Sequence, residues 1–263
     1  MNATMMKRLT IVTVLWVLNA SLQAQSPLAF EIASIKRGTP GAGVRGGCHG
    51  IDSGYSPNEA ASAPPLGRCV IRDGRLGHLL FIAYRLHSMS FVEGGPDWVK
   101  MGEDRFNIEA KVEDPTKATE QQLYQMLQAL LTERFSLKFH RETRDLSGFA
   151  LVVAKKGPKL KPSDGQDVVA DWGPSFKPSR GPNTLTARNY SMARLAEALA
   201  VFGNPVLDKT GLTGVYDFTL SWDETDGPQL STALEQQLGL KFESQKVPVS
   251  FIVIESAQKP TGN

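Results

Sequence analysis

Two segments of this chain share one pattern: MLQALLTERFSLKFHRETRDLSGFALVVA (residues 126–154) and ALEQQLGLKFESQKVPVSFIVIES (residues 233–256). Each begins with leucines at helical spacing, passes a tight junction, repeats Leu-Lys-Phe and ends in a second apolar stretch. In the first segment we expect two strands, FSLKFHRE and GFALVVAK, joined by a hairpin through TRDLSG. In the second we expect LKFES and VSFIVIES as two strands. The likeness suggests that one module occurs twice.

The correspondence extends upstream of both segments and keeps the same order. The matched sets are Leu76, Leu79 and Leu80 with Met192, Leu195 and Ala196; Phe106-Asn107-Ile108 with Tyr216-Asp217-Phe218; Leu127 and Leu131 with Leu230 and Leu234; and Leu137-Lys138-Phe139 with Leu240-Lys241-Phe242. Each half reads as βαββαββ or close to it. We therefore predict an α+β fold made by tandem duplication of a module with a small sheet and two helices. One such module buries little apolar surface, so two would share a core or stand as neighbouring lobes.

The N-terminus has the pattern of a secretory signal peptide. Lys7 and Arg8 precede the apolar run LTIVTVLWVL, and SLQAQS follows it. This run is shorter than the ~20 residues that span a bilayer. We expect residues 1–24 to be removed after Ala24, with Ala20 as the alternative cleavage point. The mature chain would then be an exported, soluble protein of the periplasm or extracellular space, in contact with the membrane only before cleavage.

The rest of the chain divides by composition. Residues 25–154 are expected to form the first repeat with an N-terminal loop, and residues 184–263 the second repeat. Between them, residues 155–183 are rich in proline and glycine, which predicts a connector with little regular structure.

The chain has two cysteines, Cys48 and Cys69, at the ends of a loop rich in Gly, Pro, Ser and Ala. In an oxidising compartment an even number of cysteines predicts a disulfide. Closing a loop of this length stabilises a fold by ~3 kcal/mol in the chain-entropy model. The alternative is a reactive thiol beside His49, although nothing nearby in the sequence is suited to lowering a thiol pKa.

Charge and histidine spacing argue against several functions. With 29 basic and 27 acidic residues, the chain has no excess charge to attract nucleic acid or an anionic membrane. None of the four histidines, His49, His78, His87 and His140, has metal-ligand spacing to another. No cofactor or metal is expected.

The stretch HGIDSG contains His49, Asp52 and Ser53, the residue types of a nucleophilic triad. Triad members normally come from separate elements, so residues this close in sequence rarely converge. Asp-Ser-Gly in a glycine-rich loop is better explained as a turn.

Two acidic clusters are the other catalytic candidates. Paired carboxylates can hydrolyse sugars or bind calcium. The clusters are Asp97, Glu103 and Asp104, and Asp223, Glu224 and Asp226. The first frames a turn and the second precedes the helix near Leu230, so solvated turns and a helix cap explain them as well.

Trp98 and Trp222 are candidate interaction anchors, because aromatic side chains are enriched in interface hot spots. Packing in the core is the alternative for both.

Several stretches, among them FEIASIKR, GGPDWVKMGEDRFNIEAK and LDKTGLTGVYDFTLSW, resemble a family of secreted proteins typical of soil Acidobacteria. The family consists of one domain of unknown function, and the resemblance covers residues 30–261. It implies no activity or catalytic residues. Some relatives are attached to membrane metallopeptidases of the antibiotic-sensor type, which implies sensing or binding outside the cytoplasm. A second resemblance, in pattern alone, is to the short N-terminal domain of secretins and TonB-dependent receptors, which docks protein partners in the periplasm.

We therefore expect a non-catalytic binding or protein-interaction module with an envelope protein as partner. The alternatives are a secreted hydrolase that uses an acidic cluster, and a sensor that binds a small molecule in an apolar pocket between the repeats.

Overall fold

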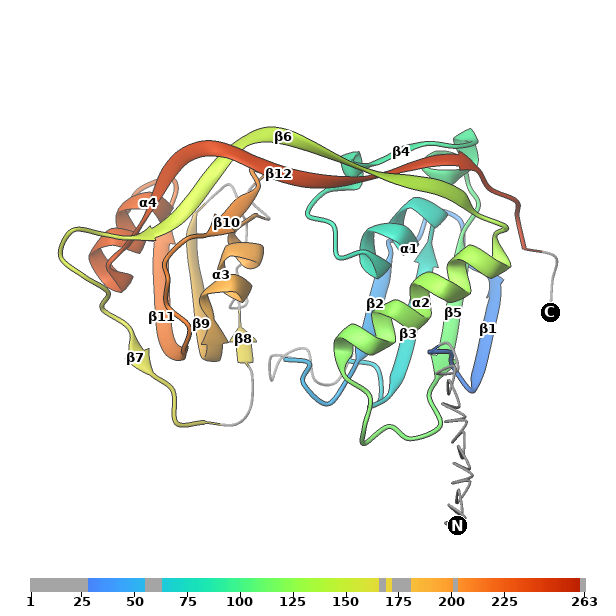
Figure 1. The fold of residues 1–263 in the computed structure, drawn as a ribbon, viewed down its shortest axis with the longest axis horizontal. Helices are drawn as coiled ribbons and strands as arrows, with labels where there is room; N and C mark the ends of the chain where they lie inside the picture. Colours follow the sequence, from blue (N-terminus) through green and yellow to red (C-terminus); the bar gives the residue numbers. More distant parts are fainter. Residues whose placement is uncertain (1–27, 55–62, 166–168, 172–180, 201–202, 261–263) are drawn as a thin grey trace, which may run out of the picture.

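A long two-stranded ribbon joins two smaller sheets, and helices cover each sheet (Figure 1). The computed structural model describes residues 28–54, 63–165, 169–171, 181–200 and 203–260. The signal peptide expected at residues 1–24 lies outside the described residues. Among the helices that are described, none is both long and apolar enough to cross a membrane.

The described strands and α-helices follow one another in the same order in both halves. They are β1 (Ile32–Arg37), β2 (Arg45–His49), β3 (Arg68–Gly74), α1 (Leu76–Ala83), η1 (Met89–Phe91), β4 (Val92–Gly94), η2 (Asp97–Val99), β5 (Phe106–Lys111), α2 (Glu120–Arg134), β6 (Lys138–Val153), β7 (Lys161–Pro162), β8 (Val169–Asp171), β9 (Pro182–Ser191), α3 (Met192–Leu199), β10 (Val206–Asp208), β11 (Val215–Asp223), α4 (Leu230–Ala233), the π-helical turn η4 (Leu234–Leu238) and β12 (Leu240–Ser256).

The first lobe consists of the antiparallel sheet β1-β5-β3-β2 and the helices α1 and α2. Strand β5 buries Phe106, Ile108 and Ala110 and turns the residues between them outward, as the alternation predicts. Apolar residues at helical spacing face the sheet from both helices, so one core fills the space between them.

The second lobe repeats this arrangement with the sheet β7-β11-β9-β8 and the helices α3 and α4. Its core is a separate cluster that includes Leu185, Leu195 and Leu220. Strands β7 and β8 come from residues 155–183, where we expected a connector with little regular structure. Two short strands can form there because they add to the edges of a sheet that β9 and β11 already build.

The ribbon is formed by β6 and β12, which pair antiparallel along almost their full length, from Leu240–Val153 to Ser256–Lys138. It passes over both lobes (Figure 1). Strand β4 adds to β12 over the first lobe, and β10 adds to β6 over the second, both in parallel. The α+β class is thus confirmed, in a mixed arrangement of three four-stranded sheets in the part of the chain described.

The hairpin expected through TRDLSG is wrong, since these residues lie inside the continuous strand β6. The two strands expected within residues 240–256 are likewise one strand. Thr143, Asp145 and Ser147 are exposed because the middle of the ribbon crosses between the two cores. Polar residues are tolerated there, and their composition resembles that of a turn.

The strand pairing over the first lobe recurs over the second lobe, with β6 and β12 in exchanged roles. Over the first lobe Arg141 pairs with Ile252, which pairs with Val92 of β4. Over the second lobe Ser244 pairs with Phe149, which pairs with Val206 of β10. The pair Pro248–Asp145 lies at the centre of this arrangement.

Candidate functional site between the two lobes

Three adjoining cavities lie beneath the ribbon, where the two lobes face each other. Their volumes are about 200, 300 and 370 Å³, and Arg85 lines all three. Helix α3 of the second lobe faces α1 of the first across this space (Figure 1). We call the three cavities together the inter-lobe cleft.

Arg85 follows helix α1 and joins the two lobes. One nitrogen of its guanidinium lies 2.8 Å from the carboxylate of Glu197 on α3, and another lies 3.5 Å from Glu120 on α2. The guanidinium also lies over the ring of Tyr124, 5.8 Å from its centre. The backbone of Arg85 is left-handed, with a φ of 50°. That conformation costs a non-glycine residue ~1–2 kcal/mol.

A second polar contact crosses the cleft nearby. Arg194 of α3 donates a hydrogen bond of 3.1 Å to the backbone oxygen of Asp52. The Asp52 carboxylate accepts a bond of 2.7 Å from the backbone N–H of Glu120, in the first turn of α2. The loop that carries Asp52 is therefore attached to α2 on one side and to α3 on the other.

Tyr84 and Tyr124 contribute aromatic surface to the cleft. Burial raises the pKa of Tyr124 to about 12, and Glu120 adds to this effect. Burial also raises the pKa of Tyr84. The guanidinium of Arg141 lies 4.8 Å from the centre of the Tyr84 ring. Both phenols stay neutral at physiological pH, so each presents a hydroxyl that can donate and accept.

His87 lies between the polar and the apolar parts of the cleft. Burial lowers its pKa, Glu197 opposes this shift, and Arg85 reinforces it. The imidazole is therefore neutral at pH 7, with one donor and one acceptor nitrogen.

The ribbon forms an apolar roof. Val247 and Val249 of β12 are buried against Phe91 and Leu86 of the first lobe. The cavity of about 200 Å³ lies beneath them and is closed on the far side by residues 205–207. The cleft thus combines an apolar wall with a few convergent polar groups, the usual composition of a small-molecule site.

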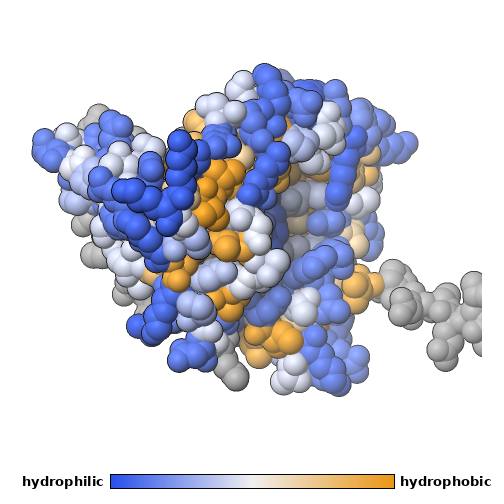
Figure 2. Space-filling view, turned by 60° about the vertical axis from the view of Figure 1, so that its left-hand side comes forward, coloured by the Kyte–Doolittle hydropathy of each residue, from blue (hydrophilic) through white to orange (hydrophobic). Residues whose placement is uncertain are grey.

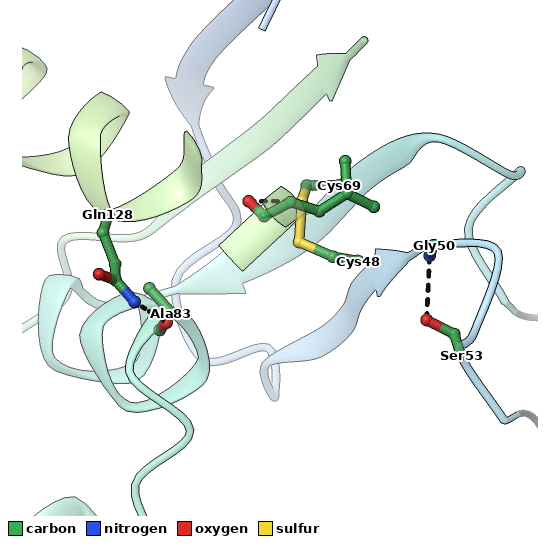
Figure 3. The surroundings of a disulfide bond; sticks show 7 residues. Cys48, Gly50, Ser53, Cys69, Ala83 and Gln128 are labelled. Carbon is green, nitrogen blue, oxygen red and sulfur yellow. Dashed lines mark hydrogen bonds between the residues drawn. A yellow bond between two sulfur atoms is a disulfide. The ribbon is translucent and has the colours of Figure 1, made fainter. Parts of the chain in front are cut away.

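The predicted disulfide is confirmed: Cys48 of β2 is bonded to Cys69 of β3 (Figure 3). This excludes the reactive thiol. The triad hypothesis is not supported, because the three side chains contact separate backbone groups. His49 contacts the Pro64 oxygen at 2.6 Å, and Ser53 accepts from the Gly50 N–H at 2.9 Å.

The acidic clusters serve structural contacts. Asp104 pairs with Lys259 at 2.9 Å. Asp223 accepts the backbone N–H of Thr225, and Glu224 accepts that of Leu230 at 3.2 Å, the helix cap that the sequence suggested. No group of three or more His, Cys, Asp or Glu side chains suited to a metal occurs among the residues described.

The two tryptophans differ in burial. Trp222 is 2% exposed inside the second core. Trp98 is partly buried against the first core, where its ring stacks near Phe135 at 6.3 Å and carries Lys259 on it. Packing accounts for Trp222, and the anchor role of Trp98 stays a prediction.

The sequence did not single out Arg85, Tyr124 or Glu197. One signal could have pointed to Tyr124, an aromatic residue at the edge of the leucine face of α2, where it is partly buried against the first core. Arg85 and Glu197 lie far apart in the chain, and nothing local marks them as partners.

The hydropathy of the surface is uneven. Figure 2 shows a mainly hydrophilic face on which hydrophobic residues gather near the middle. Large apolar side chains exposed in the second lobe include Leu207 and Val215.

Comparison with known proteins yields one match. A family model described as "Protein of unknown function (DUF3738)" matches residues 77–257. No curated protein and no solved structure matches the chain.

Proposed function

The chain belongs to the DUF3738 family of proteins of unknown function, and we propose that it is a non-catalytic binding protein that takes a small ligand into the inter-lobe cleft. The observation that carries this proposal is Arg85. A strained, left-handed arginine lines all three cavities and is held by carboxylates from both lobes. Backbone strain of this kind concentrates at functional sites.

The contacts around the cleft support recognition rather than covalent chemistry. Arg85 and Arg194 are charged donors, the tyrosines and His87 are neutral donors and acceptors, and Val247 contributes apolar surface. The carboxylates of Glu120 and Glu197 both pair with Arg85, so these contacts already engage them.

The architecture also supports closure of the lobes on a ligand. The two lobes have separate cores, and the contacts described across the cleft are polar. Lobes joined in this way are expected to move relative to one another unless their interface is large and apolar. The middle of the ribbon would act as the hinge.

We also propose that the protein acts outside the cytoplasm, in the periplasm or the extracellular space. The signal-peptide pattern at residues 1–24 and the buried disulfide between Cys48 and Cys69 support this placement.

We infer, further, that the two lobes arose by internal duplication. Their sheets have equivalent strand orders, and the ribbon pairing repeats with its strands exchanged. The junction before each Leu-Lys-Phe is left-handed in both copies, at Ser136 and at Gly239.

A thermal-shift screen of the purified mature chain with a library of small polar molecules tests the proposed function. At least one compound is expected to raise the melting temperature, because a ligand that binds only the folded state stabilises it. The shift should be lost in Arg85→Gln and kept in Glu235→Gln, which changes an exposed residue of η4.

The proposal fails if no compound raises the melting temperature, or if Arg85→Gln responds as the wild type does. Turnover of a substrate that one substitution abolishes without unfolding the chain would also overturn it.

A further inference from the structure

Arg105, immediately before β5, is a buried cation without a carboxylate partner in the described part of the chain. Arg105 is 8% exposed to solvent. One guanidinium nitrogen donates to the backbone oxygens of Gly102 and Asp104, at 3.0 and 3.1 Å. A guanidinium carries five N–H donors, so these two bonds leave others available to water or to a bound group. A cation that is largely removed from water and has no carboxylate partner among the described residues is stabilised by an anion close to it.

A second guanidinium lies close to the first. Arg75 donates from Nε to the same Gly102 oxygen, at 3.2 Å. Two positive charges therefore converge on one neutral carbonyl. The two guanidinium groups repel each other, and an anion close to them would stabilise both.

A cavity of about 700 Å³ borders Arg105 at the outer edge of the first lobe. Lys36 and Arg37 of β1, both exposed, line it together with Lys259. Of the two carboxylates on its wall, Asp104 is already paired with Lys259, and Glu103 is exposed. Even without Arg105, the basic residues that line the cavity outnumber the acidic ones.

The same cavity has an apolar side. Ile35 and Phe106 are buried residues of the first core that reach its wall, and Pro40 and Pro260 complete it. The space exceeds what a single inorganic ion needs. A small organic molecule with one anionic end would use both sides.

We propose that this cavity is a second binding site, independent of the inter-lobe cleft, for a small organic molecule that carries an oxyanion group. Arg105 would bind the oxyanion, because the planar fork of a guanidinium matches two oxygens of a carboxylate or a phosphate. Lys36 and Arg37 would add charge at the entrance. The site lies beside β1 and the chain end that follows β12, on the side of the first lobe that faces away from the second (Figure 1).

Isothermal titration at constant ionic strength tests the proposal, with inorganic phosphate and benzoate as separate probes. At least one probe should bind the wild type and raise its melting temperature. Preference for benzoate would identify a carboxylate site, and preference for phosphate a phosphate-ester site. Arg105→Gln should weaken the preferred probe at least about tenfold, because a charge-assisted hydrogen bond is lost.

Arg105 is buried, so its replacement could unfold the lobe. Lys36→Gln changes an exposed residue instead and should weaken binding several-fold with the melting temperature unchanged. Lys246→Gln, on the ribbon away from this cavity, is the matched control and should bind as the wild type does. The site is refuted if neither probe binds the wild type, or if Lys36→Gln and Lys246→Gln bind equally well.

Discussion

Asn107 in the first lobe and Asp217 in the second make the same contact. The Asn107 side-chain oxygen accepts the backbone N–H of Asp73 at 2.8 Å, and the Asp217 carboxylate accepts that of Asn189 at 2.9 Å. Asp73 and Asn189 are both left-handed, with φ values of 56° and 50°. Both contacts lie where the register of the central strand pair shifts. In the first lobe an Asn side chain accepts from a left-handed Asp, and in the second an Asp side chain accepts from a left-handed Asn.

Asn107→Asp should destabilise the protein by ~1–2 kcal/mol at neutral pH, because the new carboxylate would lie near that of buried Asp73. The neighbouring charge should hold the pKa of the introduced carboxyl above its unfolded value of about 3.9, so the loss should shrink as the pH falls through that raised pKa towards about 4. Urea unfolding at several pH values measures both effects. A loss that does not depend on pH would contradict the charge argument.

In the second lobe, Asp217→Asn should destabilise the protein less than Asn107→Asp does, because Asn189 carries no charge. Hydrogen bonds from Ser163 and from the Asn189 backbone lower the pKa of Asp217. Its ionised form therefore contributes stability above the unfolded pKa of about 3.9, and this is lost as the pH falls through the lowered value. The variant should be less stable than the wild type at pH 7 and equal to it in strong acid.

Ser136 and Gly239 offer a second matched pair. Ser136→Gly should change the free energy of unfolding by no more than about 1 kcal/mol, because relief of the left-handed strain is offset by glycine's entropy. Gly239→Ala should cost ~1–3 kcal/mol more, since its Cβ would lie 2.1 Å from the Gly157 oxygen. Equal effects in the two variants would show that this contact is not maintained in solution.

Glu197→Gln should loosen the lobes without unfolding them. The pair with Arg85 is 45% and 49% exposed, so its loss should cost less than about 1 kcal/mol. Small-angle X-ray scattering should nevertheless show a larger radius of gyration, because a contact across the cleft is removed. Glu235→Gln is the control, and an identical scattering curve for both variants would show that the pair does not hold the lobes.

Replacing both cysteines by serine should destabilise the first lobe by ~3 kcal/mol, because the loop between Cys48 and Cys69 loses its covalent closure. Hydrogen exchange should increase in β2 and β3 and remain unchanged in β9 and β11, which belong to the separate second core. A uniform increase across both lobes would contradict their independence.

Local periodicity was enough to predict the helices and most strands. The apolar faces of α1 and α3 and the alternation in β5 follow from side chains that meet one core each. The ribbon could not be predicted in this way, because Thr143–Gly148 looks like a turn when read alone. Only pairing with Pro248 and its neighbours, about a hundred residues away, keeps that segment extended.

The site was less predictable than the fold. Cys48 and Cys69 could be paired from composition and compartment, and Glu224 could be placed at a helix cap. Arg85 and Glu197 form a site only after the ribbon brings α1 and α3 together, which no local pattern encodes.

The most direct test of the central claim is to map where small polar ligands bind, by chemical-shift changes in the ¹⁵N-labelled protein. We predict that the compounds found by thermal shift perturb the amides of Arg85, Tyr124 and Glu197 together, and that Arg85→Gln abolishes those changes. Compounds that bind and stabilise the protein without perturbing any of these three amides would contradict the inter-lobe cleft as the binding site.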